Sequence, residues 1–96
     1  MLSSKQRTHL KALAHPLKPI VQVGKKGASL EVEKELARAL FDHELVKVRF
    51  MGSQSVFDDA SHLAERANAE LVAVLGKNAI MFLQNEEKPR VKLPKT

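Results

Sequence analysis

The chain has 96 residues, which is enough for one domain with a single modest hydrophobic core and too few for two domains. It contains no cysteine, which excludes a disulfide framework, a thiolate metal site and a cysteine nucleophile, and which fits a location in the cytoplasm. The formal net charge is +5, and it is unevenly distributed, because six lysines and arginines precede the first acidic residue, Glu31. This polarity favours a polyanionic partner, and RNA is the first candidate.

No stretch of the sequence has the pattern of a membrane span or a secretion signal. The longest apolar runs, residues 71–75 and 79–83, have five residues each, whereas a spanning helix needs about 20. Lys5, Arg7 and Lys11 interrupt any apolar run near the N-terminus. We therefore expect a cytoplasmic protein with no membrane partner.

The first expected helix begins near Ser3 or Ser4, either of which can cap it, and ends before Pro16. Apolar side chains recur along it at helical spacing, at Leu10, Leu13, Ala14 and Leu17. Residues 19–23 follow as a strand rich in β-branched side chains, which leads into a turn bracketed by two glycines.

The second expected helix runs from about Ser29, its N-cap, to His43. Its apolar face carries Val32, Leu36, Ala37, Leu40 and Phe41. Residues 45–50 then alternate as in a half-buried strand, with Lys47 and Arg49 on the solvated face. The buried face of that strand carries Val46, Val48 and Phe50.

A third helix is expected after the break at residues 52–55, with Val56, Ala60, Leu63, Ala64 and Ala67 on its apolar face. Residues 71–75 and 79–83 form two strands joined by a tight turn at residues 76–78. The order α-β-α-β-α-β-β predicts an α/β protein of the two-layer α+β kind, with a four-stranded mixed sheet. Right-handed crossovers place the second and third helices on one face, and leave the face with Lys47 and Arg49 open or partly covered by the first helix.

The last residues differ from the rest of the chain. Residues 85–96 are basic, contain two prolines and lack any apolar periodicity. We expect a domain over residues 1–84 and a flexible, mostly extended tail over residues 85–96 that adds little to the core.

The most informative motif is the glycine–lysine loop, which consists of Gly24, Lys25, Lys26 and Gly27. Glycines let the backbone approach a ligand closely, and the lysines add positive charge where the next helix presents its N-terminal N–H groups. The motif therefore predicts a phosphate contact, although a simple strand-to-helix turn is the alternative. A nucleotide-hydrolysing P-loop is excluded, because Gly27 and Ala28 follow where Ser or Thr is required.

Other cations could enlarge this positive surface. Arg7 and Lys11 lie one turn apart on the first helix, Lys18 precedes the first strand, and Lys47 and Arg49 share a strand face. We name these five as candidate RNA contacts, with ordinary solvated surface as the alternative for each. The tail cations would add only non-specific attraction.

Aromatic and titratable residues limit the mode of action. The chain has no Trp or Tyr, and its four phenylalanines fall on apolar faces, so we expect recognition of phosphates, 2′-hydroxyls and RNA shape, with little base stacking. The four histidines are scattered, and Asp58 with His62 gives only two possible metal ligands. We expect no catalytic residue, no metal and no cofactor.

Several sequence runs resemble those of a known family: residues 5–7, 13–19, 21–27, 43–48 and 71–76. Over residues 2–83 the chain resembles the CRM domain (chloroplast RNA splicing and ribosome maturation), in particular the stand-alone bacterial form, the YhbY family. The resemblance implies a fold similar to the C-terminal domain of translation initiation factor three. It also implies RNA contact through the glycine–lysine loop and association with large-subunit ribosome precursors.

The sequence thus predicts a monomeric, non-catalytic protein that binds ribosomal RNA in large-subunit precursors and assists ribosome maturation. One alternative of a different class stays open, a protein-docking module whose basic loop binds an acidic surface of a ribosomal protein or assembly factor. Salt-sensitive binding to protein-free RNA distinguishes the two.

Overall fold

The computed structural model describes residues 2–95 as three helices and one four-stranded sheet. The elements are, in chain order, α1 (Ser4–Ala14), β1 (Val21–Val23), α2 (Leu30–His43), β2 (Leu45–Phe50), α3 (Val56–Arg66), β3 (Glu70–Leu75) and β4 (Asn78–Phe82). The predicted order and the mixed α+β sheet are both confirmed. The strand order is β1-β2-β4-β3, with β1 parallel to β2 and the other pairs antiparallel.

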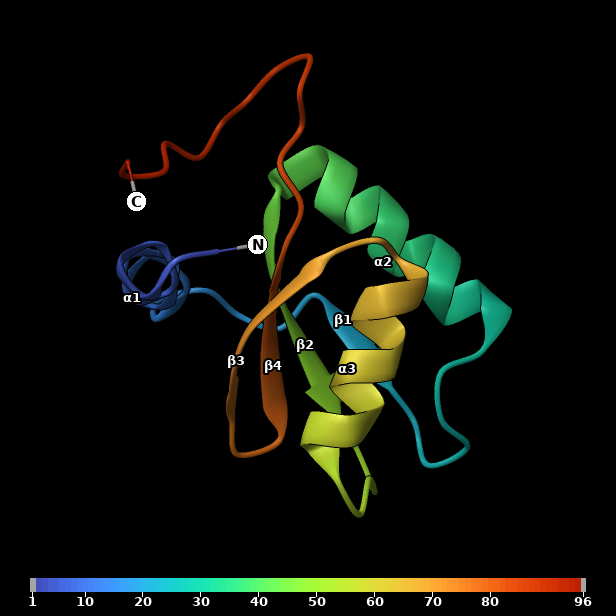
Figure 1. Cartoon of the computed structure of the whole chain (residues 1–96). Coiled ribbons are helices and arrows are strands. Elements are labelled where there is room, and N and C mark those ends of the chain that lie inside the picture. The colour runs from blue at the N-terminus through green and yellow to red at the C-terminus, as the bar shows by residue number, and fades with distance from the viewer. Residues whose placement is uncertain (1, 96) are drawn as a thin grey trace.

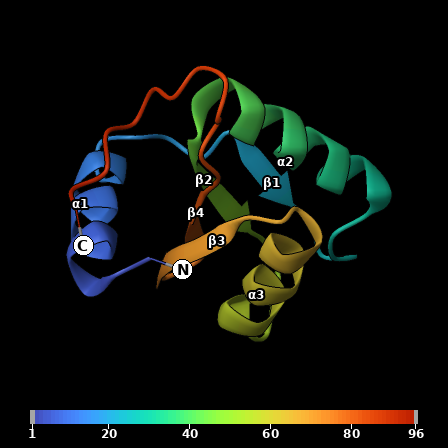
Figure 2. The same cartoon turned by 45° about the horizontal axis from the view of Figure 1, so that its top comes forward.

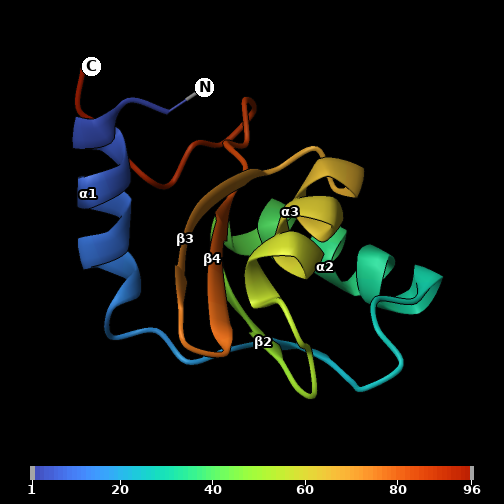
Figure 3. The same ribbon diagram turned by 60° about the horizontal axis from the view of Figure 1, so that its bottom comes forward.

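Helices cover both faces of the sheet (Figure 1). The crossovers bring α2 and α3 to one face, as predicted, while α1 lies on the other (Figure 3). The core on the α2 and α3 side joins Leu36, Leu40 and Leu63 to the inward side chains of β2. A second, smaller core lies under α1, where Leu10 and Ala14 pack with Leu45, Val72, Ile80 and Phe82.

Serine caps set where each helix begins. Ser3 forms a capping box with Gln6, because the Gln6 N–H donates to Ser3 Oγ at 3.1 Å and the Ser3 N–H donates to Gln6 Oε1 at 3.0 Å. Ser29 Oγ accepts from the Val32 N–H and Ser55 Oγ from the Asp58 N–H. These local signals explain why the predicted helix starts agree with the structure.

Several side chains expected in the core are exposed instead. Leu13 and Leu17 do not pack under α1, because Leu10 and Ala14 already occupy the contact with the sheet. Phe41 and Phe57 are each 62% exposed, whereas Phe50 and Phe82 are buried. The expectation of four core phenylalanines is therefore wrong for two of them.

The tail also departs from expectation. Its described residues, 85–95, form no helix or strand, but Val91 and Leu93 pack against the smaller core, and Gln6 Nε2 donates to the Pro94 carbonyl oxygen at 3.0 Å. Figure 2 shows this segment crossing from the end of β4 back to α1. The expectation that residues 85–96 add little to the core is corrected by these contacts, which link positions far apart in the sequence.

Candidate nucleic-acid interface

The glycine–lysine loop is an exposed turn at the carboxyl end of β1. The Gly27 N–H donates to the Gly24 carbonyl oxygen at 3.0 Å, which closes the turn, and Gly27 has a φ of 85° that favours glycine. Gly24, Lys25, Lys26 and Gly27 are all exposed. Within residues 2–95, neither lysine forms an ion pair. Both ammonium groups are thus available to an external anion.

Nothing in the folded chain fills the space beside the two glycines. A Cβ built at Gly24 or Gly27 has no neighbouring heavy atom within 4 Å. Gly27 is explained by its positive φ, but Gly24 has no such conformation and no close neighbour. The open side of Gly24 is therefore a place where a ligand backbone can come close to the protein backbone.

A second loop supports the first. The Met51 N–H donates to the Val23 carbonyl oxygen at 2.8 Å, and a Cβ at Gly52 would lie 2.7 Å from Lys25 Cγ. Because Gly52 has no side chain, the stem of Lys25 can lie directly against its backbone. A cavity of about 340 Å³ is lined by residues of both loops and by Asp58 and Asp59.

The helix N-termini contribute less to anion binding than the sequence suggests. The first turn of α2 carries Glu31 and Glu33, and the first turn of α3 carries Asp58 and Asp59. The negative charges of these carboxylates offset the positive end of each helix dipole. The positive charge around the glycine–lysine loop therefore comes from side chains of the loops and strands.

Two further cations lie near the glycine–lysine loop, at the same end of the sheet. Arg49 is exposed and pairs in register with Gln22, just before the loop. Lys77, which the sequence analysis did not single out, belongs to the hairpin turn, and its carbonyl oxygen accepts from the Phe50 N–H at 2.8 Å. We call the exposed group formed by Lys25, Lys26, Arg49 and Lys77 the basic edge. The crossover through α2 implies that β1 and β2 are parallel neighbours, which places Arg49 beside the loop. Lys77 is placed there by the pairing of Arg49 with Asn78.

Lys47 and Lys18 lie further along the α1 side of the sheet. Lys47 is on the same face of β2 as Arg49, two residues away, or roughly 7 Å along the strand. Its Nζ donates to the His15 carbonyl oxygen at 3.4 Å, so the end of α1 partly covers it. Lys18 is exposed on the connection between α1 and β1.

Arg7 and Lys11 do not extend the loop's positive surface. Figures 1 and 3 show α1 lying against one face of the sheet, well away from the loop that follows β1. Arg7 is half-buried, and its guanidinium donates to the carbonyl oxygens of Leu71 at 2.6 Å and Val72 at 3.1 Å, beside a register shift in β3. Lys11 is exposed on α1. The idea of one continuous surface from α1 to the loop is therefore corrected.

Residues 2–95 contain no cluster of three or more His, Asp or Glu side chains suited to holding a metal ion. Asp58 and His62 both lie exposed on α3. Along the same described part of the chain, every helix is too short or too polar to cross a membrane.

The comparisons with known proteins agree with this architecture. The family model of the CRS1 / YhbY (CRM) domain matches residues 2–82. The probable RNA-binding protein YqeI of Bacillus subtilis is 33% identical over 96 residues, covering 98% of this chain and 100% of the relative. An RNA-binding protein of Haemophilus influenzae is 32% identical over 96 residues, with 98% and 96% covered.

A solved structure shares the fold. The solution structure of the hypothetical protein SAV1595 from Staphylococcus aureus matches with a TM-score of 0.78 and 35% identity, covering 98% of this chain and 100% of that one. The three-helix, four-stranded arrangement is therefore that of an existing fold class. The chain belongs to the CRS1 / YhbY (CRM) domain family.

Proposed function

We propose that this protein binds RNA through the glycine–lysine loop and the basic edge, with Lys47 and Lys18 extending the contact along the sheet. The observation that carries the proposal is the exposed turn in which two unpaired lysines lie between two glycines that both have open space beside them. Lysine ammonium groups neutralise phosphates, and an uncovered glycine backbone lets a phosphodiester chain approach. The names of the relatives in Bacillus subtilis and Haemophilus influenzae support RNA as the partner.

The contact is made chiefly to the RNA backbone. Of the four phenylalanines, only Phe50 lines the cavity beside the loop, and its side chain is buried. No ring is thus presented there for stacking on a base, which is how single-stranded RNA is usually read. Backbone and shape recognition suits a folded RNA. We therefore propose ribosomal RNA in large-subunit precursors as the target, in agreement with the family resemblance, and a non-catalytic, monomeric role in ribosome maturation in the cytoplasm.

The direct test is the double variant Lys25→Ala with Lys26→Ala. Each lost phosphate contact should flatten the slope of log K against log salt by about 0.7 to 0.9. The binding of a protein-free fragment of large-subunit ribosomal RNA is measured between low and moderate salt, with circular dichroism as the check of folding. Lys34→Ala with Arg38→Ala, two exposed cations of α2, is the control with the same charge change. An unchanged slope in the loop variant would locate the RNA site elsewhere.

A second candidate function, docking of a protein partner, is favoured by a different observation. The α1 side of the molecule carries an apolar groove at some distance from the glycine–lysine loop. This groove does not replace the RNA site, because the two surfaces consist of largely separate residues.

A further inference from the structure

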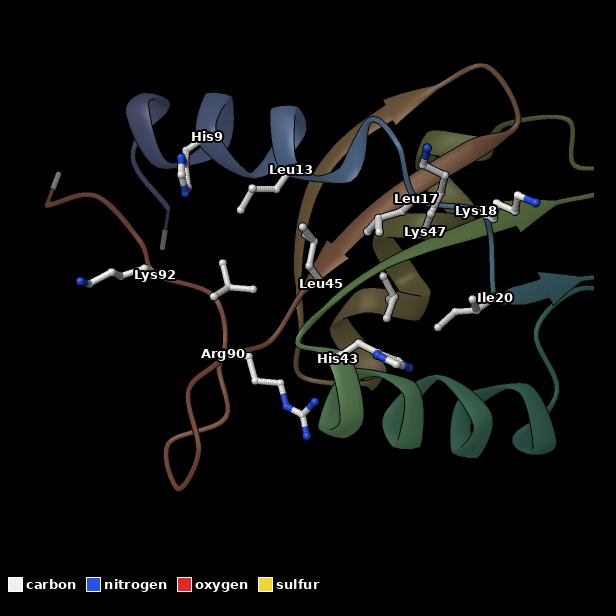
Figure 4. Close-up of a pocket in the computed structure, with 12 residues that line it drawn as sticks. His9, Leu13, Leu17, Lys18, Ile20, His43, Leu45, Lys47, Arg90 and Lys92 are labelled. Atoms are coloured by element: carbon white, nitrogen blue, oxygen red, sulfur yellow. The ribbon is translucent and has the colours of Figure 1, made fainter.

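A groove of about 630 Å³ lies between α1, the connection at residues 15–20, β2 and the tail. Figure 4 shows Leu13 facing it from α1 and Ile20 facing it from the opposite side. Leu45, at the start of β2, lies between them. His43, at the end of α2, also lines the groove, so five separate parts of the chain build one concave surface.

The floor of this groove is aliphatic and open to solvent. Leu13, Leu17 and Ile20 are 43%, 39% and 48% exposed. Exposed apolar side chains gathered in one place mark binding surfaces, because burying them gains roughly 25 cal/mol for each Å². Leu13 and Leu17 are not part of the core under α1, and their place in this groove explains why they are exposed.

The rim is positively charged. Four of the lining residues are cations, namely Lys18, Lys47, Arg90 and Lys92, and none of the described lining residues is acidic. Glu44, buried behind the tail, offsets part of the charge of Arg90. The rim still carries a clear excess of positive charge.

The tail wall is held in place by a buried carboxylate. Glu44 Oε1 accepts from the backbone N–H groups of Arg90 at 2.5 Å and Val91 at 2.6 Å, and Oε2 accepts from that of Asn85 at 2.5 Å. These bonds fix the backbone from which Arg90 and Lys92 project at the margin of the groove (Figure 4). The groove is therefore a formed part of the fold.

We infer that this groove binds a short acidic segment of a protein partner that carries bulky apolar side chains. The apolar side chains would fill the space over Leu17 and Ile20, and carboxylates would pair with the four rim cations, which is the complementarity that gives specific recognition. RNA fits less well, because the floor is made of Leu and Ile side chains, with no polar group for base edges, and the lining has no Phe, Tyr or Trp; its rings are the imidazoles of His9 and His43. A second copy of this chain fits less well, because two cationic rims would face each other.

The test selects the ligand by its chemistry. A display library of random twelve-residue peptides is selected on the wild-type protein, with counter-selection on the variant Leu17→Glu. We expect enrichment of peptides that combine Asp or Glu with Leu, Ile or Phe. One enriched peptide is then synthesised and titrated into isotope-labelled protein, and the amide signals of groove residues should shift.

Matched variants distinguish groove binding from general attraction of acids to a basic protein. Ile20→Glu in the floor and Lys18→Glu at the rim should each lower peptide affinity about tenfold or more, equal to about 1.4 kcal/mol. Leu30→Glu and Lys34→Glu, which change exposed residues of α2 outside the groove, should leave it nearly unchanged. Melting temperatures check that all four variants remain folded.

Four results would overturn the inference. These are equal peptide binding by wild type and Ile20→Glu, peptide-induced shifts confined to the basic edge, shifts of the floor residues Leu13 and Leu17 caused by a uridine dodecamer in place of the peptide, and a wild-type dimer that Leu17→Glu dissociates. The Lys25→Ala, Lys26→Ala variant should bind the peptide normally. Loss of RNA binding and loss of peptide binding are thus separate outcomes.

Discussion

At the scale of single residues, Gly24 is a glycine that the fold of the free protein does not require. Its backbone has no positive φ, and a Cβ there would meet nothing within 4 Å. Gly27 differs, because its φ of 85° makes any other residue strained. Gly27 is therefore explained by folding, whereas a glycine at Gly24 is explained only by the proposed approach of RNA.

Gly24→Leu should leave the free energy of unfolding within about 0.5 kcal/mol of wild type, since the side chain enters solvent. It should lower RNA affinity about tenfold, because the added side chain occupies the space proposed for the RNA backbone. Urea unfolding and RNA titration measure the two quantities. Gly27→Leu is the comparison, and it should lose both stability and RNA affinity. Full RNA affinity in Gly24→Leu would show that the loop is only a charged turn.

Glu44 is a second residue with an unusual environment, because its ionisable side chain is buried. It caps α2 with a φ of 63°, and its side chain is fully buried. Burial acts to raise its pKa, but three backbone N–H donors and the charge of Arg90 act against burial and prevail, so the pKa of Glu44 is lowered. A lowered pKa in the folded state means that the ionised carboxylate stabilises the fold.

Glu44→Gln should lower the free energy of unfolding by about 3 kcal/mol at neutral pH, because a charged acceptor of three buried hydrogen bonds is lost. The stabilisation in wild type is fully present above the ordinary glutamate pKa of about 4.3 and is lost as the pH falls through the lowered value. The difference between the two proteins should therefore be constant above about pH 5 and shrink below it. Urea unfolding at several pH values measures this, with exposed Glu35→Gln as the control. A constant difference down to pH 2 would contradict the role of the charge.

At the scale of elements, local signals explain what the sequence predicts correctly. Serine caps, alternation in residues 45–50 and the glycine of the hairpin turn act over a few residues, and each predicted element exists close to its expected bounds. Other features depend on contacts between segments that are far apart in the sequence. These are the bonds between Glu44 and the tail, the exposure of Phe41 and Phe57, and the groove. The periodicity of a single segment carries no information about such long-range contacts. The glycine–lysine loop, a local motif, was therefore predictable from the sequence, and the groove was not.

The edge of the sheet shows one such long-range contact. β3 is an edge strand with a register shift between Leu71 and Ala73, and Arg7 from α1 donates to the carbonyl oxygens of Leu71 and Val72. Hydrogen bonds from a charged donor stabilise the irregular backbone and cover part of an otherwise unpaired edge. Arg7 is therefore better explained by stability than by RNA contact.

Arg7→Ala should lower the free energy of unfolding by about 1.5 kcal/mol and leave the salt slope of RNA binding unchanged. Lys11→Ala, one helical turn away and exposed, is the control and should change stability by less than about 0.5 kcal/mol. Urea unfolding and salt-dependent RNA titration decide between the two roles. A flatter salt slope with wild-type stability would return Arg7 to the RNA surface.

At the scale of the whole molecule, the two proposed binding surfaces, the basic edge and the groove, are centred on different parts of the fold. The basic edge lies at the carboxyl ends of β1 and β2, and the groove lies between α1, β2 and the tail. Lys18 and Lys47 line the groove and also continue the positive surface from Arg49. If both proposals hold, the chain would bind RNA through the basic edge and a protein segment through the groove.

If the proposed RNA is ribosomal, the protein should sediment with large-subunit precursors and not with finished ribosomes. That association should weaken as salt rises, because exposed lysine–phosphate contacts are screened and counterion release becomes less favourable. The Lys25→Ala, Lys26→Ala variant should move to the free fraction at lower salt than wild type, whereas Ile20→Glu should not respond to salt differently from wild type. Gradient sedimentation of cell extracts with detection of the protein measures each distribution. Recovery only in free fractions at low salt, or equally on mature ribosomes, would contradict the maturation role and favour protein docking as the main function.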